Sequence, residues 1–142
     1  MWKRLAVMTA LSFMAMYILM YLMVDEFQNV YPSLNQLYMA ATMTAAMVII
    51  ELGVMWAMYP SQGKKLLVLA LSALALVLAI AGTRKQVGIN DVEFLRSMIP
   101  HHAGAILMCN EADLTDPELK VLCQNIVSGQ QAEIDLMKAK LR

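Results

Sequence analysis

Residues 5–24, LAVMTALSFMAMYILMYLMV, decide the class of this protein. Twenty residues without a charged side chain match the roughly 20 that a helix needs to cross the hydrocarbon core of a bilayer. Residues 38–59 are as long and carry Glu51, whereas residues 66–81 are shorter and wholly apolar. The sequence therefore predicts a three-helix transmembrane region within residues 1–82, surrounded by membrane lipid.

The composition supports a membrane protein and argues against several other classes. The chain of 142 residues is 60% hydrophobic, 15% charged and formally uncharged overall, against about 25% charged residues in soluble domains. Lys3 and Arg4 would suit a signal peptide, but the apolar run is too long and no small-residue cleavage site follows it. We interpret the first segment as a retained helix. No basic patch for a nucleic acid is visible.

Lysine and arginine placement predicts the orientation. Residues 25–37, between the first two spans, contain neither. Two basic residues precede the first span and two more separate the second from the third: Lys3, Arg4, Lys64 and Lys65. Because basic residues stay in the cytoplasm, we expect a bacterial inner-membrane protein with a cytoplasmic N-terminus and a periplasmic C-terminal region. Arg84 and Lys85, just after the third span, argue against this orientation.

The C-terminal region predicts a helical hairpin over residues 90–142, after a linker at residues 83–89. Asn90 and Glu93 have the spacing of a capping box, and the helix they start should reach about Glu111, with a kink at Pro100. A second capping box, at residues 115–118, precedes apolar residues at helical spacing: Leu119, Leu122, Ile126, Ile134, Met137 and Leu141. The predicted fold class is all-α, with three transmembrane helices followed by a helical hairpin.

Two helices cannot enclose a core. Their apolar stripes must meet another copy of the chain, the membrane helices or a site held together by a metal ion. We expect a homo-oligomer, a dimer or a larger assembly, that builds a four-helix bundle from such hairpins.

Soft metal ligands gather at the centre of this hairpin. Within twelve residues lie Met98, His101, His102, Met108 and Cys109. Imidazole, thioether and thiolate together suit Cu(I), and steps of three and four residues place both histidines beside Met98 on a helix. The competing interpretation is that the methionines are packing residues and the histidines are partly solvated.

The second helix and the cysteines leave alternatives open. The register of a hairpin that folds back near Asp113 brings Gln130 and Glu133 closer to the histidines than Met137. Cys109 either pairs with Cys123, which closes a loop of about 15 residues and contributes roughly 3 kcal/mol, or is a thiolate ligand.

The motifs of common enzymes are missing. Neither histidine has a glutamate three residues before it, as di-iron bundles require. The zinc-protease motif His-Glu-x-x-His and a glycine-rich phosphate loop are also lacking. Cys109 is about two helical turns from the histidines, too far for a nucleophile and its base. We therefore predict that the protein is not an enzyme.

Methionine is unevenly spread over the apolar segments. The first two spans hold five each and the third holds none. A soft-ion path through the membrane would use the outer members of this set and one carboxylate: Met16, Met20, Met23, Met39, Met43, Met47 and Glu51. The simpler interpretation is that methionine is an adaptable packing residue.

Three strings in the hairpin resemble a known family. They are Phe94-Leu-x-x-Met-Ile-Pro-His-His102, Asp116-Pro-Glu118 and Gln130-Gln-Ala-Glu-Ile-x-x-Met137, and they are similar to the domain-of-unknown-function 305 family over roughly residues 91–141. That family is ferritin-like and includes CopM-like periplasmic copper-binding proteins. The resemblance implies Cu(I) or silver binding through methionine and histidine, here Met98, His101, His102, Met108 and Met137.

The resemblance also implies a role in copper tolerance or delivery. A single hairpin is half of a ferritin-like four-helix bundle, so association would have to complete it. The apolar helices resemble a membrane-anchored subgroup. We predict a membrane-anchored Cu(I)-binding protein that protects against copper or hands it to a periplasmic copper protein. The alternative is a structural or regulatory membrane subunit whose hairpin docks a partner. A transporter is a third option. It would require an oligomer, because three helices alone do not form a pore.

Overall fold

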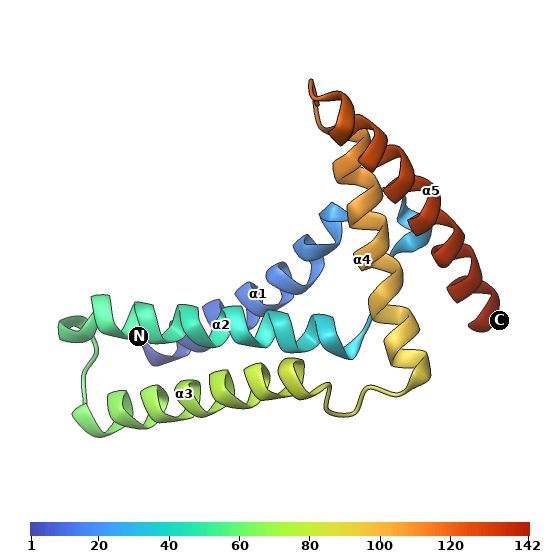
Figure 1. Ribbon diagram of the computed structural model, residues 1–142. Coiled ribbons are helices and arrows are strands. Elements are labelled where there is room, and N and C mark those ends of the chain that lie inside the picture. Colours follow the sequence, from blue (N-terminus) through green and yellow to red (C-terminus); the bar gives the residue numbers. More distant parts are fainter. The chain divides into compact units, whose positions relative to one another are not determined.

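The computed structural model describes all 142 residues and contains helices and no strands (Figure 1). The α-helices are α1 (Trp2–Leu19), α2 (Leu34–Val54), α3 (Gln62–Lys85), α4 (Asp91–Glu111) and α5 (Pro117–Lys140). Three short 3₁₀ helices are η1 (Met20–Met23), η2 (Phe27–Asn29) and η3 (Trp56–Met58). The all-α prediction is confirmed.

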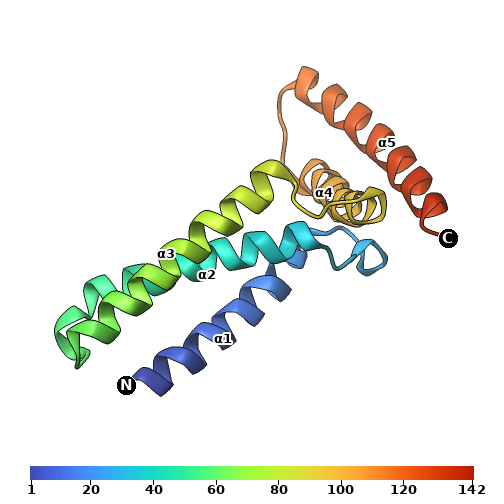
Figure 2. The ribbon, with the colours of Figure 1, turned by 90° about the horizontal axis from the view of Figure 1, so that it is seen from below.

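The chain forms two compact units that are not contiguous in sequence. The first unit consists of residues 1–20 and 35–88, which hold α1, α2 and α3 (Figure 2). The second consists of residues 21–34 and 89–142, so it combines the hairpin of α4 and α5 with the segment that joins the first two apolar helices. The sequence alone assigned that segment to the membrane region.

Three helices are long and apolar enough to cross a membrane: Trp2–Met23, Leu34–Val54 and Gln62–Lys85. The second is shorter at its C-terminal end than the expected span of residues 38–59. Pro60 disfavours helical backbone at the residue before it, and Tyr59 is extended, with φ −87° and ψ 123°.

The first unit has a small core at one end. Leu5, Leu52 and Tyr59 are buried there, and the Trp2 and Tyr59 rings lie 5.0 Å apart. Most other apolar side chains of α1 and α3 face outward. Such a surface suits a hydrocarbon surrounding, where helices need not bury apolar groups against one another.

Helix α3 continues past the expected start of the linker at residue 83. It ends only at Gln86, whose left-handed backbone (φ 50°, ψ 44°) forms the cap, and the Val87 N–H bonds to the Gly82 carbonyl at 3.1 Å. Gly82 lies inside the helix, where a Cβ would come within 2.9 Å of the Tyr38 ring. This glycine therefore permits a close approach of Tyr38 and does not start the linker.

The hairpin begins at the predicted caps, with one correction. Asn90 accepts a hydrogen bond from the Glu93 N–H at 2.9 Å. The second helix is capped by Asp116 and not by Thr115, since the Asp116 carboxylate accepts from the Glu118 N–H at 2.8 Å. Pro117 occupies the first turn, where its missing N–H has no helical partner to lose.

The core of the hairpin lies between α4 and α5. It comprises Ile99, Ala103, Ile106, Ile134 and Met137. Val24 and Tyr31 of the joining segment pack against it, and the Leu34 N–H donates to the Glu93 carboxylate at 2.8 Å. The segment between α1 and α2 therefore covers part of the hairpin core, which two helices alone cannot enclose.

Candidate functional site

His102 is fixed at both ring nitrogens. It lies on α4 and is only 7% exposed. Its Nδ1 is 2.9 Å from the Met98 carbonyl oxygen one turn earlier, and its Nε2 is 2.6 Å from a carboxylate oxygen of Glu133 on α5. The imidazole therefore links the two helices of the hairpin at a defined position.

The two partners of His102 determine what its ring can do. A carbonyl oxygen and an ionised carboxylate both accept hydrogen bonds, and each lies within hydrogen-bond distance of one ring nitrogen. A metal ion can bind Nε2 only after the contact with Glu133 is broken. The bond from Nδ1 to the Met98 carbonyl can persist, and it is the kind of bond that orients metal-ligating histidines.

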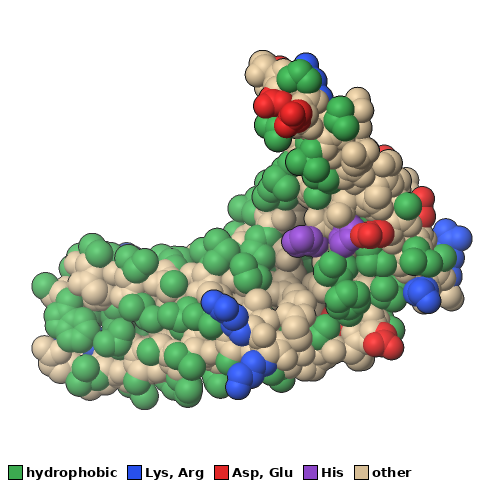
Figure 3. Space-filling model, in the orientation of Figure 1, with side chains coloured by type: hydrophobic (Ala, Val, Ile, Leu, Met, Phe, Trp, Pro, Cys, Tyr) green, Lys and Arg blue, Asp and Glu red, His purple; other side chains and the backbone are tan.

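His101 is exposed next to this pair. The ring centres of His101 and His102 are 6.2 Å apart. Two imidazoles that share one ion have centres about 6 Å apart, because each metal–nitrogen bond is about 2 Å. The histidine side chains reach the surface of the hairpin beside a carboxylate (purple and red in Figure 3). Their spacing fits one shared ion, provided that the His102 Nε2 is released from Glu133.

The hairpin register brings Glu133 of α5 opposite His102 of α4. Gln130 lies one turn before Glu133 on α5 and is half-buried. Met137 lies one turn further along α5, in the hairpin core.

The sulfur-containing candidates fall into three environments. Met137 is buried in the hairpin core, and Met98 packs against that core. Met108 is 56% exposed. Cys109 is joined to Cys123 in a disulfide with a Cα–Cα distance of 5.2 Å, which removes its thiolate from the ligand set in this form. No group of three or more His, Cys, Asp and Glu side chains is placed to hold a metal ion.

The hairpin also carries a match to a known protein family. The model of the family described as "Domain of unknown function (DUF305)" matches residues 79–141. An uncharacterized protein of Acanthamoeba polyphaga mimivirus is 31% identical over 137 residues, which cover 94% of this chain and 88% of that protein. The chain belongs to the DUF305 family. No solved structure matches it.

The two matches differ in what they include. The DUF305 match contains the end of α3 and the whole hairpin, but not residues 21–34. The segment that covers the hairpin core thus lies outside the family domain. The viral relative aligns over most of the chain, so the likeness extends into the apolar helices.

The membrane-path candidates are only partly brought together. Met16, Met43, Met47 and Glu51 line one groove of about 520 Å³ between α1 and α2. Met55, which the sequence-based path did not include, lines it as well. Met20, Met23 and Met39 do not line it. The four-residue steps from Met43 to Met55 were the signal that could have identified the last member.

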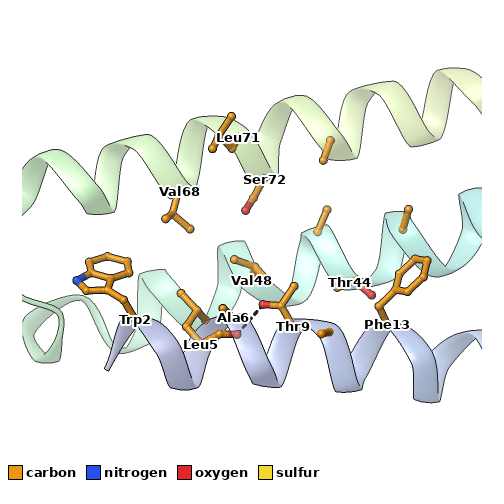
Figure 4. A pocket seen from close by; sticks show the side chains of 14 residues that line it. Trp2, Leu5, Ala6, Thr9, Phe13, Thr44, Val48, Val68, Leu71 and Ser72 are labelled. Atoms are coloured by element: carbon orange, nitrogen blue, oxygen red, sulfur yellow. Dashed lines mark hydrogen bonds between the residues drawn. The ribbon is translucent and has the colours of Figure 1, made fainter.

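A second hollow lies between α1, α2 and α3 (Figure 4) and has a volume of about 720 Å³. Small and apolar side chains line most of it, among them Leu5, Phe13 and Val48. Thr9, on its wall, donates its hydroxyl proton to the Leu5 carbonyl oxygen at 2.8 Å. A hollow with so few polar groups suits hydrocarbon and offers no metal ligands.

Proposed function

We propose that this protein is a membrane-anchored binder of Cu(I) or Ag(I), with its hairpin at the periplasmic face of the bacterial inner membrane, acting in copper tolerance or delivery. One observation carries the proposal. The His102 ring is held by the Met98 carbonyl at Nδ1, and its Nε2 lies on the side of the ring that faces Glu133, next to an exposed His101. The proposed function requires no catalysis.

The first two ligands are the imidazoles of His102 and His101. Nitrogen and thioether donors suit Cu(I) and Ag(I), whereas oxygen donors suit hard ions. Met98, one turn before His102, is the thioether next to the histidines in the sequence, and the exposed Met108 lies about two turns further along α4. Binding at Nε2 replaces the contact between His102 and Glu133, and the carboxylate of Glu133 can remain beside the ion.

The apolar helices supply the anchor. Lys3 and Arg4 in the first turn of α1, and Lys64 and Lys65 in the first turn of α3, favour a cytoplasmic location for those ends. The hairpin then lies on the opposite side, where an oxidising periplasm suits the disulfide between Cys109 and Cys123.

A second copy of the chain completes the bundle in this proposal. Several large apolar side chains of the hairpin remain exposed: Val92, Phe94, Met108, Leu119, Val121, Leu122 and Leu136. Two such surfaces packed together would build a ferritin-like four-helix bundle, as the CopM-like resemblance implies. Light scattering in a mild detergent should give at least a dimer, and a monomeric mass would contradict this part of the proposal.

An anaerobic Cu(I) titration against a competing chelator tests the hairpin site. We expect the His101→Ala/His102→Ala variant to bind Cu(I) at the hairpin at least about 100-fold more weakly, since it lacks both nitrogen ligands. Met137→Leu is the matched control, because it changes a core thioether while nearly conserving volume. Binding should weaken as the pH falls, because protons compete for imidazole. Full Cu(I) affinity in the double variant would refute the site.

A structural or regulatory subunit is the second candidate. The observation in its favour is that both ring nitrogens of His102 already have partners, so in this arrangement the residue links α4 to α5. In that case His102→Ala should destabilise the hairpin, and the purified protein should carry no copper or silver after growth with either metal.

A further inference from the structure

Methionine and glutamate form one continuous stripe along α2. Met43, Met47, Glu51 and Met55 follow one another at four-residue steps, so each lies one turn from the next. Met55 follows the last residue of α2 but continues its geometry, since its N–H bonds to the Glu51 carbonyl at 2.8 Å. All four line the groove of about 520 Å³ between α1 and α2.

Helix α1 adds a fifth donor to this groove. Met16 lines the groove, and its sulfur accepts a hydrogen bond from the Thr44 hydroxyl at 3.5 Å. That contact turns the thioether toward α2. Thioether sulfur is a neutral, soft ligand that selects Cu(I) over hard cations.

Glu51 is the only acidic residue in the three apolar helices. The Tyr59 hydroxyl donates to one of its oxygens at 3.1 Å, and no lysine or arginine forms an ion pair with it. The amine of Lys65 donates to the Trp56 carbonyl at 3.1 Å and lies 4.6 Å from the centre of the Trp56 ring. A carboxylate at membrane depth without a cation is costly.

We propose that this groove is a second binding site, for a soft monovalent cation of the Cu(I) and Ag(I) class. Met16, Met43 and Met47 supply the thioether ligands, and Glu51, one turn beyond Met47, supplies the balancing charge. One carboxylate and one monovalent ion form a neutral site, which a low-dielectric surrounding tolerates, whereas a divalent ion would leave a net positive charge. Packing alone does not explain why α3, which is also apolar enough to cross a membrane, contains no methionine.

The groove site does not depend on the proposed function of the hairpin, because no hairpin residue takes part in it. The test therefore uses the full-length His101→Ala/His102→Ala chain in detergent as its background. Ag(I) is the probe, since it is soft, monovalent and stable in air. Binding is followed by calorimetry and by metal analysis after desalting.

In that background we expect Ag(I) still to bind and Met43→Leu/Met47→Leu to weaken binding about 10-fold or more. Leucine nearly conserves the volume of methionine, so packing is retained. The matched control is Met14→Leu/Met58→Leu, whose methionines are 58% and 57% exposed and lie outside the groove. Silver-edge X-ray absorption should show sulfur ligands that only the groove variant loses. Absence of bound Ag(I) in the background, or equal losses in groove and control variants, would overturn the proposal.

Glu51→Gln tests the charge balance separately. The amide oxygen can still accept from Tyr59, so the unfolding midpoint should stay unchanged. The affinity for Ag(I) should fall, and neither the variant nor the natural sequence should bind Zn(II) at the groove. Unchanged Ag(I) affinity would refute the role of the carboxylate. A different result is expected if only the hairpin proposal is wrong. Replacement of both histidines would then leave Cu(I) binding intact, whereas Met43→Leu/Met47→Leu would abolish Cu(I) binding.

Discussion

The two units of the molecule treat their apolar side chains in opposite ways. In the hairpin, Ile99, Ala103 and Ile134 have no exposed surface, and the joining segment packs against them. In the three-helix unit, only 6% of the most apolar window of α1, 28% of that of α2 and 11% of that of α3 is buried. The hairpin therefore gains stability by removing apolar area from water. The apolar helices leave most of their apolar surface exposed, as a lipid surrounding would permit. The same residue types are therefore buried in one unit and exposed in the other.

The proposed ligands follow the same division. The hairpin offers two nitrogen donors, the exposed imidazole of His101 and the buried one of His102. The groove between α1 and α2 offers neutral thioethers and one carboxylate within an apolar helix. The following substitutions test this contrast, and equal effects in the two units would contradict it.

The largest expected effect is in the hairpin core. Ile134→Ala should lower the free energy of unfolding by about 2–5 kcal/mol, because it opens a cavity at a residue with no exposed surface. Leu78→Ala on α3, where leucine is 61% exposed, should change it by no more than about 0.5 kcal/mol. Circular dichroism during denaturant titration in detergent measures both, and equal losses would remove the contrast between the units.

The disulfide should have the next largest effect. Replacing Cys109 and Cys123 by serine should lower hairpin stability by about 3 kcal/mol, since the bridge spans 14 residues and restricts the unfolded chain. A reductant should destabilise the natural sequence and leave the double-serine variant unchanged. The bond is absent if unfolded, unreduced protein titrates with two free thiols.

Part of this hairpin follows from local sequence signals. Asn90, Pro117 and the helical periodicity predict both helices, and Cys123 was one of two alternatives for Cys109. The carboxylate of Glu93 was expected to reach back to its own helix start, but it accepts from Leu34, 59 residues away. Residues 21–24 continue the first apolar run and residues 25–34 have no periodic pattern. They meet the hairpin through Val24, Tyr31 and the Leu34 N–H, so their membership of the second unit could not be predicted.

A close approach in the three-helix unit gives a smaller effect. Gly82→Ala places a Cβ 2.9 Å from the Tyr38 ring and should cost about 1–3 kcal/mol through overpacking. Gly53→Ala on α2 is the control, because nothing lies within 4 Å of its Cβ position, and it should be neutral or slightly stabilising. Unfolding in sodium dodecyl sulfate compares the two. A stabilising Gly82→Ala would show that α2 and α3 do not approach as described.

The link between the hairpin helices should have the smallest effect on stability. Glu133→Ala removes the carboxylate partner of His102, but the side chain is 60% exposed, so solvent limits the loss to about 1 kcal/mol or less. Glu133→Gln should lose less, since its amide oxygen still accepts from the ring. Thermal unfolding measures both variants. A loss of several kcal/mol would indicate a purely structural pair and favour the subunit alternative.

The central claim is that the hairpin binds Cu(I) through His101 and His102. Copper-edge X-ray absorption on Cu(I)-loaded Met43→Leu/Met47→Leu protein tests it most directly, because this variant removes two of the groove ligands and keeps the hairpin ligands. The account predicts that Cu(I) stays bound after desalting, with the scattering pattern of imidazole nitrogen in its coordination shell. It also predicts that the pattern disappears when His101 and His102 are replaced by alanine. A variant that retains no Cu(I), or that shows the same spectrum without the histidines, would contradict it.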